Sequence, residues 1–67
     1  MTNTEAMEYM RTRAARLNRS YNKGTLDRAY VRGVVIGMTD AFVKAGIIEE
    51  SVALVDEILD IALDERG

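Results

Sequence analysis

The sequence predicts an all-α protein of three helices in a single domain that spans residues 1–67. Apolar residues recur at steps of three and four along three segments, which is the period of an amphipathic helix. Glycines and capping residues separate these segments, and the chain contains no proline. A chain of 67 residues builds only one small core, so self-association is a reasonable way to gain stability.

The first helix is expected over residues 3–22. Thr2 and Glu5 have the spacing of a capping box, in which each side chain accepts a hydrogen bond from the other residue's backbone N–H. Gly24 is expected to end the helix, because glycine readily takes the left-handed conformation after a last turn. The apolar stripe of this helix consists of Met7, Met10, Ala14, Leu17 and Tyr21. Arginines lie off the stripe and give the helix a basic side: Arg11, Arg13, Arg16 and Arg19.

The second helix is expected over residues 26–45, with Thr25 as its N-cap and Asp27 in its first turn. It is apolar nearly all round, which is typical of a helix that lies centrally or is covered by a second subunit. Its main apolar face consists of Val31, Val35, Met38 and Phe42. Gly33 and Gly37 each cost about 1 kcal/mol of helix propensity. A close helix crossing at these small residues is the favoured compensation, and a chance placement is the alternative.

The third helix is expected over residues 49–65, with its first residue near Glu49 or Ser51. Gly46 ends the preceding helix, and Ile47 is expected to pack back near Phe42 in a Schellman-type cap. The apolar stripe of the third helix consists of Ile48, Val52, Val55, Leu59 and Ala62. Carboxylates form a like-charge row on the opposite side: Asp56, Glu57, Asp60 and Asp64.

Charge is divided unevenly along the chain. Residues 1–32 carry seven basic and three acidic side chains, a net charge of +4, whereas residues 33–67 carry two basic and eight acidic side chains, a net charge of −6. This division fits either an attraction between the first and third helices or two surfaces for different partners, and we favour the first. The basic first helix is thus expected to offset the repulsion between the carboxylates of the acidic row, either within one chain or between two chains.

The aliphatic content exceeds what three short helices can bury. The residues that look surplus are Ile36, Val43, Leu54 and Ile61. A homodimer that packs the second or third helix across a two-fold axis would cover them, because such an axis pairs one patch with itself. We therefore expect a dimer, with Gly33 and Gly37 among its packing residues.

Catalytic and metal chemistry is nearly excluded by composition. The chain has no cysteine and no histidine, and its serines have no apparent base beside them, so we expect no enzyme activity. Carboxylates in a line on one helix do not wrap around an ion, so we expect no metal or cofactor. The acidic row is interpreted as a solvated or partner-facing surface. No stretch predicts a secretory signal or a transmembrane helix, so a soluble cytoplasmic protein is expected.

The run from Arg11 to Lys23 supports a second hypothesis, a small nucleic-acid-binding regulator that uses the first helix. An isoelectric point near 5.0 argues against it. The second and third helices have the outline of a helix-turn-helix. In that motif the third helix would enter the DNA groove and present its carboxylates to phosphates, which disfavours this arrangement. Membrane-surface binding is disfavoured, since the apolar stripe of the first helix is modest and is needed for the core.

The segment from Tyr30 to Ile48, YVRGVVIGMTDAFVKAGII, resembles the central helix and glycine-capped turn of very short proteins carried by bacteriophages and prophages. The resemblance implies a protein that inhibits host enzymes or defence systems by binding a protein target, and it implies no particular site residues. The function we expect is a non-enzymatic protein–protein interaction module, with its partner on the acidic row or on the basic side of the first helix.

Overall fold

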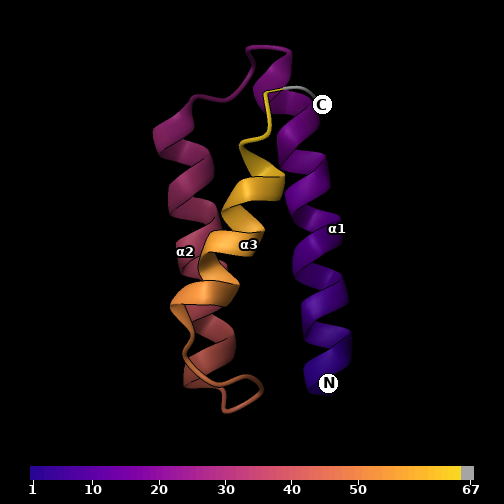
Figure 1. Ribbon diagram of the computed structural model, residues 1–67, viewed down its shortest axis with the longest axis vertical. Coiled ribbons are helices and arrows are strands. Elements are labelled where there is room, and N and C mark those ends of the chain that lie inside the picture. Colours follow the sequence, from indigo (N-terminus) through magenta and orange to yellow (C-terminus); the bar gives the residue numbers. More distant parts are fainter. Residues whose placement is uncertain (66–67) are drawn as a thin grey trace.

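The computed structural model describes residues 1–65 and contains three helices, with no strand in that range (Figure 1). They are α1 (Asn3–Asn22), α2 (Arg28–Lys44) and α3 (Val52–Ala62). The prediction of a three-helix all-α fold is confirmed. None of these helices combines the length and apolar character that crossing a bilayer requires.

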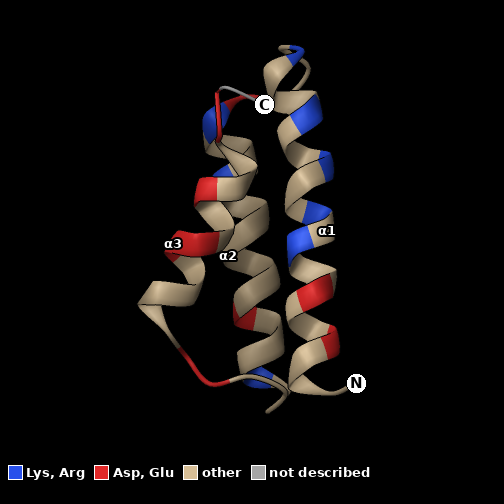
Figure 2. Ribbon diagram, turned by 45° about the vertical axis from the view of Figure 1, so that its right-hand side comes forward, with Lys and Arg blue, Asp and Glu red and all other residues tan. Residues whose placement is uncertain are grey.

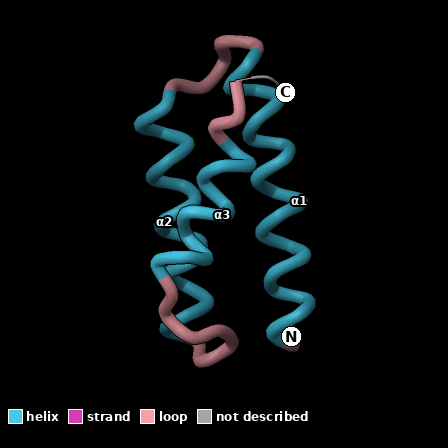
Figure 3. The backbone as a smooth tube through the Cα atoms, viewed as in Figure 1, coloured by secondary structure: helices cyan, strands magenta, loops and turns pink. Residues whose placement is uncertain are grey.

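The helices form an elongated bundle that measures 34 × 18 × 17 Å between Cα atoms. α1 and α2 run in opposite directions, and α3 lies across both of them (Figure 1). The two connecting loops lie at opposite ends of the bundle (Figure 3). All three pairs of helices are in contact, and α3 packs most extensively against α1. Residues from the two ends of the chain are therefore brought together.

The ends of α1 form as the sequence predicts. The backbone N–H of Thr2 donates to Oε1 of Glu5 at 2.9 Å, and the N–H of Glu5 donates to Oγ1 of Thr2 at 3.1 Å, which completes the capping box. At the other end Gly24 has a φ of 81°, the left-handed conformation that glycine adopts without strain. The predicted bounds of this helix, 3–22, are confirmed.

The other two helices are shorter than predicted. Asp27, not Thr25, is the N-cap of α2, since Oδ1 of Asp27 accepts a 2.7 Å hydrogen bond from the N–H of Tyr30. Ser51 caps α3 in the same way, so Glu49 and Glu50 lie in the loop before it, and α3 ends at Ala62. The start of the second helix was predicted too early, and of the two starts expected for the third helix only Ser51 agrees with the structure. Several residues near each start are good caps, and only tertiary packing selects one.

The turn after α2 agrees with the predicted Schellman geometry. Gly46 has a φ of 75°, and the N–H of Ile47 donates to the carbonyl oxygen of Phe42 at 3.0 Å. Phe42 also makes an edge-on contact with Tyr9 of α1, with ring centroids 5.9 Å apart. This turn directs the next residue, Ile48, into the core, where it is 5% exposed although it belongs to no helix.

The core lies where the three helices meet. Its largest fully buried side chains are Met10, Val31, Val35 and Ile58. The predicted stripes miss three buried residues, Ala6, Asn18 and Thr39, and they wrongly include Val52, which is 78% exposed. Thr39 is accommodated because its hydroxyl donates to the carbonyl oxygen of Val35 at 2.9 Å, so the buried polar group is satisfied within its own helix.

A pair of asparagines on α1 satisfies the C-terminal end of α3. Nδ2 of Asn18, a residue only 8% exposed, donates to the carbonyl oxygens of Ala62 at 3.1 Å and Asp64 at 2.6 Å. Nδ2 of Asn22 also donates to the carbonyl oxygen of Asp64, at 2.8 Å. The last carbonyl groups of a helix have no partner within it, so Asn18 caps α3 from outside, and both asparagines fix a residue just beyond the helix end.

Replacing the capping amide by an isosteric acceptor tests this junction. Asn18→Asp removes two donors and places a carboxyl group against two carbonyl oxygens, so the free energy of unfolding should fall by about 2 kcal/mol or more. Urea unfolding followed by circular dichroism measures this change. Asn3→Asp is the matched control, because it makes the same substitution at an exposed position in the first turn of α1 and should leave stability unchanged or slightly raised. A loss below about 0.5 kcal/mol for Asn18→Asp would contradict the capping role.

The capping box predicts a pH dependence. Hydrogen bonds from the backbone N–H of Thr2 and then from its side chain lower the pKa of Glu5 from its ordinary value of 4.5. A carboxyl group whose pKa is lower in the folded state than in the unfolded state stabilises the protein at pH values above the unfolded-state pKa. This stabilisation is lost as the pH falls through the folded-state pKa. Glu5→Gln should therefore unfold at a lower temperature than wild type near pH 7. This difference in unfolding temperature should shrink as the pH falls below 4.5. A difference that stays constant down to pH 2 would be inconsistent with this account.

Candidate functional site

The acidic face consists of the predicted row: Asp56, Glu57 and Asp60 lie on α3, and Asp64 lies just beyond its end. Glu57 forms an ion pair with Arg11 of α1, with Nη2 of Arg11 3.0 Å from Oε1 of Glu57. The three aspartates share a surface depression with Arg28 and Arg32 of α2. The predicted contact of the row with α1 is thus found within one chain at Glu57, whereas the two arginines that share the depression with the aspartates come from α2.

The predicted basic side of α1 is split by the fold. Arg11 points toward α3, and the remaining cations form the outer basic face: Arg13, Arg16, Arg19 and Lys23. These four residues are exposed, and none forms an ion pair with a carboxylate of residues 1–65. Nη1 of Arg13 donates to the hydroxyl of Tyr9 at 3.1 Å. Figure 2 shows these cations along the half of α1 that follows its acidic first turns.

Gly33 and Gly37 do not mediate a helix crossing within the chain. A Cβ atom built on either glycine would find nothing within 4 Å, so both positions open onto solvent. The predicted close crossing is therefore wrong for the single chain. Contact of this ridge with a second chain stays a prediction.

Only one of the four aliphatic residues predicted to be surplus remains exposed. Val43, Leu54 and Ile61 are half-buried and pack against the core. The three helices therefore bury more aliphatic side chains than the sequence predicted. Ile36 is 44% exposed and lies on the outer side of α2. The monomer thus leaves a smaller apolar surface for a partner than expected.

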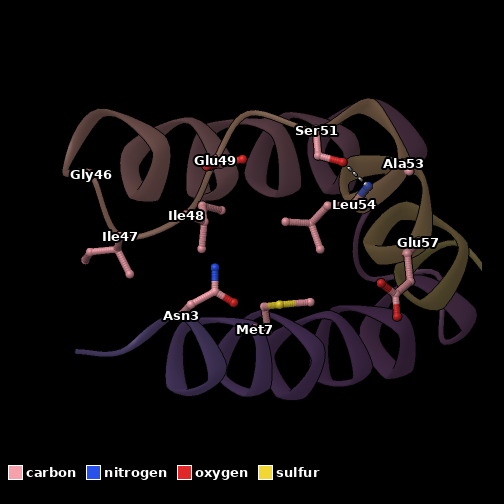
Figure 4. Close-up of a pocket in the computed structure, with 10 residues that line it drawn as sticks. All are labelled: Asn3, Met7, Gly46, Ile47, Ile48, Glu49, Ser51, Ala53, Leu54 and Glu57. Carbon is pink, nitrogen blue, oxygen red and sulfur yellow. Dashed lines mark hydrogen bonds between the residues drawn. The ribbon is translucent and has the colours of Figure 1, made fainter.

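An open groove lies at the end of the bundle, between the start of α1 and the segment that joins α2 to α3. Its volume is about 730 Å³. Asn3 and Met7 of α1 point into it from one side, and Ile48 and Leu54 point into it from the other (Figure 4). Glu49 and Glu57 are also among the residues that line it. We call this feature the end groove.

Sequence reasoning did not find the end groove. It placed Ile48 on the apolar stripe of the third helix, whereas this residue lies in the loop and forms the base of the groove. The signal in the sequence was two adjacent isoleucines between a helix-ending glycine and two glutamates. One of these isoleucines packs into the core, while Ile47 stays half exposed at the groove edge.

No group of three or more acidic side chains within residues 1–65 is arranged to hold a metal ion. The hydroxyl of Ser51 accepts a hydrogen bond from the N–H of Leu54 as a helix cap, and Ser20 lies in a shallow depression beside Arg13 and Arg16. The surfaces with distinct chemistry are the outer basic face, the end groove and the outer side of α2.

No protein-family model matches the chain, and neither curated proteins nor solved structures include a significant match to it.

Proposed function

We propose that this protein is a non-enzymatic interaction module that binds an acidic surface of another protein through its outer basic face. The observation that carries the proposal is the difference between its two charged faces. The acidic face lies beside Arg11, Arg28 and Arg32, whereas the outer basic face has no carboxylate of residues 1–65 in ion-pair contact. Uncompensated cations on a rigid helix attract and orient an oppositely charged partner.

The dimensions of this face favour a protein over a nucleic acid. Its cations run from Arg13 to Lys23, about 15 Å along the helix axis at 1.5 Å per residue. Exposed Glu5 and Glu8 precede them on α1, and Glu65 lies at the other end, where it accepts a hydrogen bond from the hydroxyl of Tyr21. Phosphates continue along a nucleic acid past both ends of the face and would meet these carboxylates. A short acidic patch of a protein would end within the face and would not meet these carboxylates.

A phage-encoded inhibitor or accessory factor that acts on a host protein is the most concrete form of this proposal. The resemblance of residues Tyr30 to Ile48 to short phage and prophage proteins supports it. Binding of DNA or RNA by the run from Arg11 to Lys23 is the second candidate function. The observation that favours it is the set of exposed cations that follow Arg11 on α1, since Arg11 itself is paired with Glu57.

We further propose a homodimer that pairs the outer sides of two α2 helices. A two-fold axis places each surface against its own copy, so the outer basic face and the acidic face would each repel themselves. The outer side of α2 carries one ion pair, Lys44 with Asp40 at 3.0 Å, and is otherwise uncharged between Gly33 and Lys44. The open space at Gly33 and Gly37 would admit a second backbone.

Charge-neutral substitutions test the outer basic face. A fluorescent glutamate-rich peptide and a 20-base-pair DNA duplex serve as probes, and binding is followed by fluorescence anisotropy at low salt. Arg16→Gln with Arg19→Gln should weaken peptide binding about tenfold, since two close charge pairs are lost. Arg32→Gln with Lys44→Gln removes the same charge from α2 and should have little effect. Equal losses in the two variants would reject the assignment to α1, and tighter binding of the duplex than of the peptide would favour nucleic acid.

Light scattering at micromolar concentration tests the dimer. Wild type should show about twice the chain mass of 7.5 kDa. Ile36→Glu places like charges near the proposed axis and should give a monomer with an unchanged circular dichroism spectrum. Val52→Glu is the control, because Val52 is 78% exposed on α3 and the same substitution there should leave the dimer intact. A wild-type mass near 7.5 kDa would refute the dimer.

A further inference from the structure

The outer side of α2 carries an open depression next to an exposed isoleucine. The depression has a volume of about 470 Å³ and is lined by Arg28, Ala29, Arg32, Gly33 and Ile36. Its surface is mostly apolar, since arginine side chains contribute methylene groups as well as guanidinium groups. A Cβ atom built on Gly33 would meet nothing within 4 Å, so no described part of the chain covers the depression at this glycine. We call this feature the α2 depression.

The shape of this surface is complementary to itself. Ile36 is 44% exposed and lies at the C-terminal edge of the α2 depression. A two-fold axis exchanges two copies of one surface, so an apolar side chain beside a depression on one copy can enter the same depression on the other. Both isoleucines would be covered at once in this way.

The charges around Ile36 are complementary to themselves only when the two helices are antiparallel. Asp40 lies one turn after Ile36. Arg32 and Arg28 lie one and two turns before it, and neither forms an ion pair with a carboxylate of residues 1–65. Lys44 contacts Oδ2 of Asp40 and leaves Oδ1 without a partner in that range. A parallel pair would place each charge beside its own copy and would therefore be repulsive.

We infer that two copies of this chain pair through antiparallel α2 helices, with Ile36 of each copy in the α2 depression of the other. Along such a pair, one turn toward the C-terminus of one helix is one turn toward the N-terminus of its partner. Asp40 therefore lies level with the partner's Arg28 when Ile36 lies level with the partner's Arg32. The two-fold axis repeats this ion pair. The inference rests on the proposed homodimer and assigns its orientation, its register and the contacts that make it specific.

Charge reversal and its rescue test the register. Asp40→Arg places two arginines together at both symmetric contacts, so the Kd of the dimer in sedimentation equilibrium should rise about tenfold or more. Adding Arg28→Asp to the same chain restores both pairs with exchanged signs and should return the Kd to within about threefold of wild type. Glu8→Arg is the control, because it makes the same change of charge at an exposed position of α1 and should leave the Kd unchanged. Circular dichroism checks that every variant folds.

A distance measurement tests the orientation. The chain has no cysteine, so Lys44→Cys provides a single site for a spin label. Lys44 lies about ten residues from the level of the axis, so the two labels of an antiparallel pair should be about 30 Å apart at 1.5 Å per residue. In a parallel pair the labels would be less than about 20 Å apart, since packed helix axes are close together.

Three results would overturn the inference and leave the dimer in place: an unchanged Kd for Asp40→Arg, a double variant as weak as this single one, or the short label distance. A wild-type chain that remains monomeric would overturn the dimer and the inference together. Failure of the assigned register is therefore distinguishable from failure of the proposed homodimer.

Discussion

The amide groups of Asn18 and Asn22 fix the C-terminal end of α3 against α1, and the rest of the bundle depends on this junction. α3 has only 11 residues, fewer than an isolated helix needs to be stable in water. Its stability comes from packing and from external hydrogen bonds at its C-terminal end: Asn18 donates to the carbonyl oxygen of Ala62, and both asparagines donate to that of Asp64 just beyond the helix. The end groove lies away from this junction, with one wall from the start of α1 and the other from the start of α3 and the loop before it.

The distribution of charge follows from this packing and does not drive it. Docking of α3 turns Arg11 toward Glu57, but both side chains are nearly half exposed, so their ion pair contributes at most about 1 kcal/mol. The same orientation places Asp56 and Asp60 beside arginines of α2 and leaves the cations from Arg13 onward outside. Most charged side chains of the two oppositely charged halves therefore lie on separate surfaces, and few of them pair with one another.

Local patterns predicted the helices because capping and apolar period are properties of neighbouring residues. The bounds of α1, its capping box and the turn at Gly46 all depend on contacts within a few residues. The apolar period did not predict burial where a tertiary contact determines it. Asn18 is polar, yet it is buried because a helix end 44 residues away needs its amide. The end groove could not be predicted, since no short segment contains both of its walls.

The three surfaces occupy different elements, and this bears on how they could work together. The residues that line the end groove come from α1, the loop and α3, and the outer basic face comes from α1 alone. A dimer formed through the outer side of α2 would therefore cover neither and would present each of them twice. Two linked copies of a weak site raise the effective affinity for a partner with repeated or symmetric features. For a chain of 67 residues, whose single surfaces are small, duplication is the physical route to tight binding without a larger core.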